Sequence, residues 1–139
     1  MIVKCIAKYP SEDEMTYLGP KFFKERDFHV TIGREYIVFA LTFLAEPDFA
    51  GRGLFVDIVT DFGHLVGVPL CLFSIIEGSA SRYWEIREGK AGQITMWPQS
   101  FYREYYHDDL SEGVPEIVQD FNRVRALIEA EVIGRHQPG

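Results

Sequence analysis

The segment from Phe28 to Leu44 is the longest run of β-branched and aromatic residues in the chain, and it constrains the fold more than any other stretch. After Gly33 it reads as a single strand. Side-chain alternation would place two mainly apolar sets on its opposite faces: Tyr36, Val38, Ala40 and Thr42 on one, and Ile37, Phe39, Leu41 and Phe43 on the other. Apolar residues on both faces are typical of a strand buried on both sides. The sequence therefore predicts a central strand that needs a partner on each edge.

Shorter apolar stretches, separated by turn signals, can supply these partners. We predict further strands over residues 2–7, 54–60, 65–68, 70–76, 82–88 and 93–97. Tight turns are expected at 51–53, 61–64 and 89–92, and the first of them predicts a hairpin between the central strand and 54–60. Short strands at this spacing indicate a small antiparallel sheet or barrel.

Two sequence signals predict short helices. Ser11 and Glu14 have the spacing of a capping box, which predicts a helix from there to about Leu18. Pro98 suits the first position of a helix, and the aromatic residues that follow it recur at helical spacing. We therefore predict a second helix from Pro98 to about Asp109.

The clearest periodicity in the chain lies between Pro115 and Val132. Apolar residues recur there in steps of three and four: Ile117, Phe121, Val124, Ile128 and Val132. This pattern predicts an amphipathic helix, which we expect to stop at Gly134. The predicted fold class is α+β, with a small antiparallel β-sheet or SH3-like barrel and a C-terminal amphipathic helix packed on it. We expect one domain over residues 1–139, with strands mainly in 2–97 and a helical region over 98–133.

The formal net charge of −7 narrows the classes of partner. Nucleic acids and anionic membranes attract basic surfaces, so we expect neither as a partner, and a basic protein is the more natural one. No apolar run reaches the roughly 18 residues of a membrane span, and the start of the chain lacks the apolar core of a signal peptide. Cys5 and Cys71 both lie in apolar stretches and are predicted to be buried, reduced thiols. We therefore expect a cytoplasmic protein.

No local motif fixes a chemical activity. The four histidines are scattered without metal-ligand spacing, and there is no Cys-x-x-Cys pair. Asp61-Phe62-Gly63 matches a kinase tripeptide, but the other kinase signatures are missing and a turn is the better interpretation. We expect no catalytic residue, metal or cofactor. The alternative is that His107 acts as a base, or as a cation ligand with Asp108 and Asp109.

The stretch 100–112 is the best candidate for a binding surface. One helix cannot bury all of its aromatic rings while its flanks carry carboxylates, so some phenol edges should reach solvent. Tyrosine beside carboxylates suits recognition of a basic partner. The predicted partner-binding residues are Glu104, Tyr105, Tyr106, His107, Asp108, Asp109 and Glu112. In the competing interpretation the rings face the core and the acids form a solvated rim.

Three segments carry a resemblance to small SH3-like β-barrel proteins of bacteria: 32–38, 69–77 and 81–85. With its acidic balance and small size, the chain resembles immunity proteins of bacterial polymorphic-toxin and contact-dependent-inhibition systems, over roughly Phe28 to Trp97. The resemblance implies a non-enzymatic protein that neutralises a cognate bacterial toxin. We expect its acidic, Tyr-rich surface to cover a basic or substrate-binding surface of the toxin. Because the matching segments fall on core positions, the resemblance does not indicate which residues of this chain would contact a toxin.

Two other functions stay open at the level of sequence. One is a small enzyme or ligand-binding domain with an aromatic pocket lined by tyrosines, Trp84 and His107. The other is an oligomerisation module that uses the helical region as a symmetric interface. The sequence leaves the partner and the oligomeric state undetermined.

Overall fold

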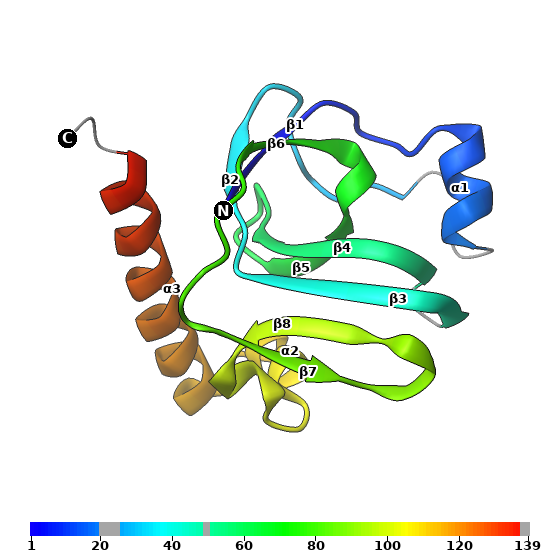
Figure 1. The fold of residues 1–139 in the computed structure, drawn as a ribbon. Helices are drawn as coiled ribbons and strands as arrows, with labels where there is room; N and C mark the ends of the chain where they lie inside the picture. Colours follow the sequence, from blue (N-terminus) through cyan, green and yellow to red (C-terminus); the bar gives the residue numbers. More distant parts are fainter. Residues whose placement is uncertain (20–25, 49–50, 137–139) are drawn as a thin grey trace.

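The structure, a computed structural model, describes residues 1–19, 26–48 and 51–136. Its strands form two antiparallel sheets, and a long helix, α3 (Pro115–His136), follows them (Figure 1). This arrangement confirms the predicted α+β class with a C-terminal helix. Among the described residues, no helix combines the length and apolar character needed to cross a membrane.

The smaller sheet has the strand order β2-β1-β6, and the larger has the order β5-β4-β3-β8-β7. The strands of the smaller sheet are β1 (Ile2–Cys5), β2 (Glu35–Ile37) and β6 (Phe73–Glu77). Those of the larger are β3 (Ala40–Asp48), β4 (Gly51–Val59), β5 (Leu65–Pro69), β7 (Trp84–Glu88) and β8 (Ile94–Pro98). The predicted hairpins β3–β4 and β7–β8 are confirmed, since both pairs are antiparallel. Within the described pairings β5 and β7 are the two edges of the larger sheet, so these strands form an open sheet.

The predicted central strand is divided between the two sheets. It breaks at Val38 and Phe39, which leaves β2 in the smaller sheet and β3 in the larger. The Val38 amide donates to the carbonyl of Met1, whereas the Phe39 amide donates to the carbonyl of Asp57 on β4. The prediction of one continuous strand was therefore wrong. Both of its faces are apolar because neighbouring side chains enter different cores: Tyr36 and Val38 belong to one, whereas Ile37 and Phe39 belong to the other.

The first core lies between the two sheets. It contains Val3, Tyr36, Val56, Ile58, Val68 and Phe73, together with Leu18 of helix α1 (Glu12–Leu18). Ser11 caps this helix as predicted: the Glu14 amide donates to Ser11 Oγ, and the Ser11 amide donates to Glu14 Oε1 at 2.8 Å. The prediction of a free, buried thiol holds for Cys5, whereas Cys71 is free and half-buried.

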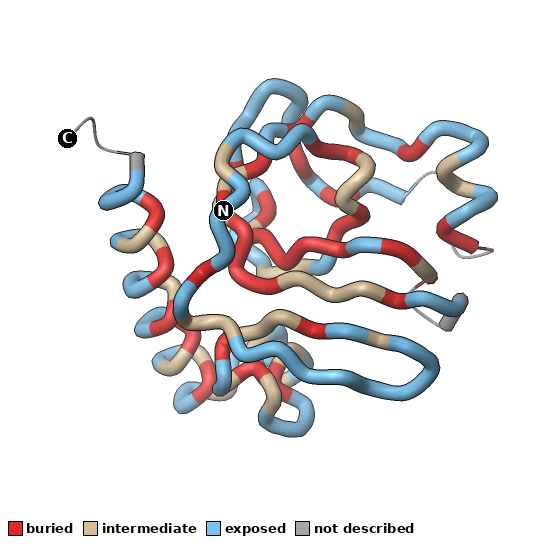
Figure 2. Tube along the Cα trace, viewed as in Figure 1, coloured by how far each residue is buried: buried red, intermediate tan, exposed pale blue. Residues whose placement is uncertain are grey.

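The second core is built by α3. All five residues of its predicted stripe are buried, and they pack with Phe39 and Ala40 of the chain crossing and with Phe101 and Tyr106. Figure 2 shows buried positions recurring along the helix. The predicted end was wrong, because α3 continues through Gly134 to His136. Glycine in a helix costs only about 1 kcal/mol relative to alanine, which neighbouring turns can absorb.

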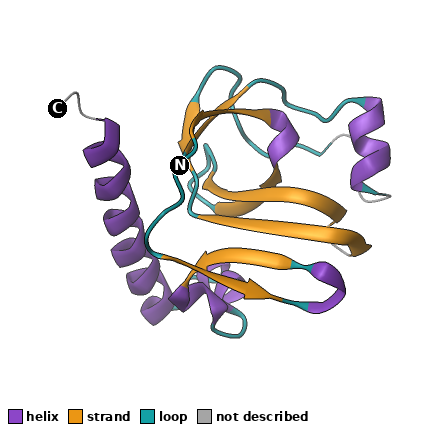
Figure 3. Cartoon of the chain, in the orientation of Figure 1, coloured by secondary structure: helices purple, strands orange, loops and turns teal. Residues whose placement is uncertain are grey.

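Two other predicted elements are interrupted (Figure 3). The expected strand 70–76 begins with a 3₁₀ turn, η2 (Leu70–Leu72), before β6. The expected helix from Pro98 to Asp109 is also wrong. Pro98 ends β8, and it is followed by a 3₁₀ turn, η4 (Gln99–Tyr102), and then by helix α2 (Tyr106–Ser111).

Candidate functional site

The predicted partner-binding residues are divided by the way α2 packs. Tyr106 and His107 turn towards the protein, Asp109 is half-buried, and the exposed members are Glu104, Tyr105, Asp108 and Glu112. Five of these residues remain accessible to a partner: Glu104, Tyr105, Asp108, Asp109 and Glu112. We refer to them as the Tyr105 surface.

Tyr106 belongs to the second core and not to the molecular surface. Its side chain is only 2% exposed and its ring stacks on Phe101, with the ring centroids 4.7 Å apart. Its hydroxyl donates to Asp120 Oδ2 of α3 at 2.8 Å. Burial, followed by this hydrogen bond and the charge of Asp120, raises the pKa of Tyr106. A partner cannot contact this ring in the structure, so the prediction of Tyr106 as a partner-binding residue was wrong.

His107 attaches α2 to the larger sheet. Its Nε2 donates to Asp57 Oδ2 on β4 at 2.8 Å, and the rings of Trp97 and Phe101 approach it edge-on. Burial alone would lower the pKa of His107, but the hydrogen bond and charge of Asp57, together with the charge of Asp108, raise it. The carboxylate that pairs with His107 is thus the one 50 residues away, and not a neighbour on its own helix. This pair fixes the position of α2.

The outward part of the segment centres on Tyr105. This residue has a left-handed backbone (φ 62°, ψ 20°) immediately before α2, and its side chain is 66% exposed. Its carbonyl accepts from the Asp109 amide at 2.8 Å, so the strained residue is fixed to the first turn of the helix. Between residues 103 and 116 the sequence has five carboxylates against one guanidinium, that of Arg103. The Tyr105 surface is therefore an exposed aromatic ring with negative charge around it.

A second polar cluster surrounds Asp61, in the turn after β4. Three groups donate to its carboxylate, each at 2.7 Å: the hydroxyls of Thr31 and Tyr36 and the guanidinium of Arg34. Burial would raise the pKa of Asp61, but the hydrogen bonds from Thr31 and Tyr36 and the charge of Arg34 lower it. Through these three hydrogen bonds, Asp61 holds the segment 31–36 against the turn that follows β4. Residues 61–63 form the predicted turn.

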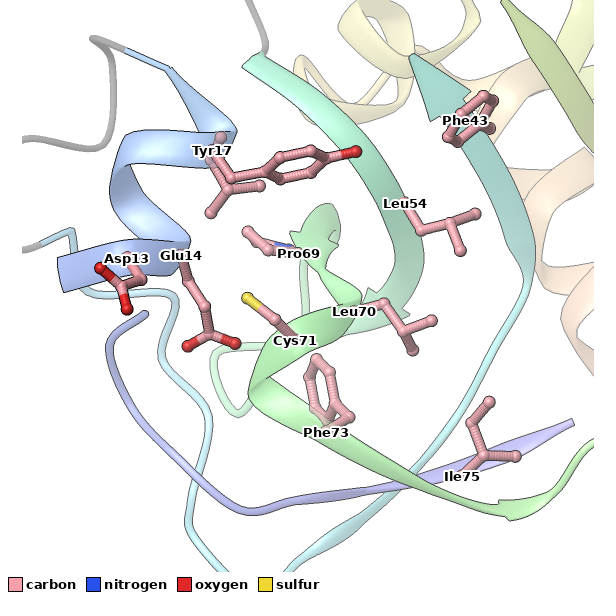
Figure 4. A pocket seen from close by; sticks show the side chains of 11 residues that line it. Asp13, Glu14, Tyr17, Phe43, Leu54, Pro69, Leu70, Cys71, Phe73 and Ile75 are labelled. Carbon is pink, nitrogen blue, oxygen red and sulfur yellow. The ribbon is translucent and has the colours of Figure 1, made fainter. Parts of the chain in front are cut away.

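Sequence reasoning missed an apolar groove of about 750 Å³ at the other end of the molecule. Its walls come from α1, η2 and β6, and β3 and β4 contribute to its floor (Figure 4). No local signal could have found it, because its lining residues come from four separate stretches of the chain. The described residues contain no group of three or more His, Cys, Asp or Glu side chains that could hold a metal ion.

The chain matches no protein-family model, no curated protein and no solved structure. Its function is therefore inferred from the exposure, charge and contacts of the described residues.

Proposed function

We propose that this is a non-enzymatic binding protein that docks a basic partner protein through the Tyr105 surface. The observation that carries the proposal is Tyr105 itself, a largely exposed tyrosine with a left-handed backbone beside Glu104 and the carboxylates of α2. Left-handed backbone costs a residue other than glycine about 1–2 kcal/mol. Such strain concentrates at binding and catalytic sites, where it fixes a side chain in advance. It supports a role for Tyr105 that its own packing does not explain.

The surroundings of Tyr105 suit the rim of a protein interface. Tyrosine supplies contact area at a low cost in side-chain entropy, and it is enriched among the residues that dominate binding energy. Glu104, Asp108 and Glu112 are exposed, so their field acts on an approaching molecule before contact. The His107–Asp57 pair holds α2 on β4, so the helix presents these groups from a fixed position. A basic partner would gain both a faster encounter and an aromatic contact.

The resemblance to bacterial immunity proteins supplies the class of partner. In this proposal the protein neutralises a cognate toxin by covering a basic or substrate-binding surface of the toxin domain. The proposal requires a gene for a large secreted toxin beside the gene for this chain. The C-terminal domain of that toxin is the partner to purify for binding measurements.

Association kinetics at low and moderate salt test the surface. Replacing Asp108 and Glu112 by Lys should lower the association rate by about tenfold at low salt, because steering by charge contributes about 10- to 1,000-fold to association rates. Tyr105→Ala should mainly raise the dissociation rate, also by about tenfold, which corresponds to about 1.4 kcal/mol.

The matched control replaces two exposed acids elsewhere by Lys, Glu35 on β2 and Glu88 on β7. It should associate with the partner at the rate of the unmodified protein. The two double variants have the same net charge, so a difference between them reports position. Equal association rates for both would reject the Tyr105 surface. Absence of a neighbouring toxin gene, or a toxin domain that fails to bind, would reject the immunity role.

A further inference from the structure

The groove beside α1 is far from the Tyr105 surface in sequence and in the fold, and it has different chemistry. We propose that it is a second binding site, which takes a small organic cation with a compact hydrocarbon body and one ammonium group. Its volume of about 750 Å³ lies within the range of about 300–1,000 Å³ that is typical of small-molecule sites. This site is independent of the proposed protein-docking function.

The walls of the groove leave large apolar side chains in contact with water. Tyr17 of α1 is 50% exposed, Leu54 of β4 is 43% exposed and Ile75 of β6 is 51% exposed. Phe43 lies directly opposite Leu54 in the β3–β4 pairing and extends the apolar floor. Exposed apolar residues are ordinary when scattered, but several around one hollow mark a binding site. A hydrocarbon body in the groove would remove this surface from water.

Tyr17 is held in place against β4. A Cβ atom at Gly53, which has φ +100°, would lie 2.9 Å from Cε1 of the Tyr17 ring, so only glycine allows the ring to approach this closely. Arg52 lies over the same ring, with its guanidinium carbon 4.5 Å from the centroid, and its Nε donates to the Tyr17 carbonyl. Arg52 is not among the residues that line the groove. The ring therefore forms a fixed wall.

The charge of the groove selects the ligand. Asp13 and Glu14 are its charged lining residues, and within 1–19, 26–48 and 51–136 no Lys, Arg or His lines it. The capping box holds the Glu14 carboxylate at one end of the groove, facing the Cys71 thiol (Figure 4). Burial, followed by the charge and hydrogen bond of Glu14, raises the pKa of Cys71 to about 12. The thiol therefore stays protonated, and Glu14 remains the negative group available to an ammonium ion. An anion of the same shape would meet the two carboxylates Asp13 and Glu14.

Two probes with the same hydrocarbon body and opposite charge test the proposal: 1-adamantanamine and 1-adamantanecarboxylate. Titrated into the ¹⁵N-labelled full chain at neutral pH, the amine should bind at least ten times more tightly than the carboxylate. Amide shifts should concentrate at Glu14, Tyr17, Leu54 and Cys71. Equal affinity for the two probes, or shifts elsewhere, would overturn the proposal.

Three variants assign the effect to the groove. Glu14→Gln retains the capping box, since glutamine can make the same reciprocal bond, but it removes the charge. It should reduce the preference for the amine to a few-fold at most. Leu54→Glu places a further carboxylate in the apolar floor and should abolish binding of the carboxylate probe. Ile86→Glu, at a 65% exposed position of β7 outside the groove, should leave the affinity for both probes unchanged.

A different occupant would give a different result. If neither adamantane probe binds at millimolar concentration while a basic amphipathic peptide shifts the same amides, the groove takes a protein segment and the small-cation proposal is wrong. Persistence of the full amine preference in Glu14→Gln would also refute it. Neither outcome bears on the Tyr105 surface, because that surface shares no residue with the groove.

Discussion

The hydrogen bond between His107 and Asp57 should make the stability of the protein depend on pH. His107 has a raised pKa in the folded protein, so folding favours its charged form. A raised pKa adds stability that is fully present below the unfolded value, about 6.5 for histidine, and is lost as the pH rises through the folded value. We therefore expect the protein to lose stability between about pH 6.5 and the higher pKa of folded His107.

The size of the effect follows from the exposure of the two side chains. Asp57 is 11% exposed, and breaking a fully buried pair costs about 3–5 kcal/mol. His107, however, is 36% exposed, so solvent screens the pair substantially. A coupling of about 1 kcal/mol is a reasonable magnitude for a partly screened, charge-assisted hydrogen bond. In a chain of this length it corresponds to a shift of roughly 4 °C in Tm.

A double-mutant cycle isolates this coupling. The variants are His107→Gln, Asp57→Asn and the double variant, each unfolded in urea at about pH 6 and about pH 8.5, on either side of the expected transition. The coupling should be about 1 kcal/mol at the lower pH and clearly smaller at the higher. A coupling that is the same at both values, or that grows with pH, would refute the assignment of a raised pKa to His107. The other groups with shifted pKa values are carboxyls, thiols, a guanidinium and phenols, which titrate mainly outside this window.

Two further substitutions test the parts of the fold that position the candidate sites. Ile128→Ala, at a position of α3 with no exposed surface, should lower the free energy of unfolding by about 2–5 kcal/mol in urea, whereas Ala substitution of the exposed Leu127 beside it should cost much less. Ser11→Ala should cost about 1 kcal/mol by removing the α1 cap, and amide exchange should accelerate within residues 12–18 while α3 is unaffected; a uniform acceleration would show that the cap does not act locally.

The elements that the sequence predicts well are those specified by neighbouring residues. The stripe of α3 follows from a helical period within one segment, and the cap of α1 depends on Ser11 and Glu14, three residues apart. The break at Val38 and Phe39 is different. Alternation along a strand looks the same whether the next residue continues in one sheet or crosses to another, so only the positions of the neighbouring strands decide it.

The candidate sites were harder to predict for the same reason. The acidic character of residues 104–112 is visible in sequence, but the inward turn of Tyr106 depends on the left-handed backbone at Tyr105, which interrupts the helical spacing. The partner of His107 lies 50 residues earlier in the chain. The groove requires α1, η2 and β6 to meet the larger sheet, which no local pattern encodes.

The crossing at Val38 and Phe39 has a mechanical consequence. These adjacent residues are 0% and 2% exposed, and each is packed into a different core. A single peptide bond therefore joins the interior beneath the groove to the interior beneath α3. A shift of the backbone on one side of that bond is passed directly to the other, with no loop between them to absorb it.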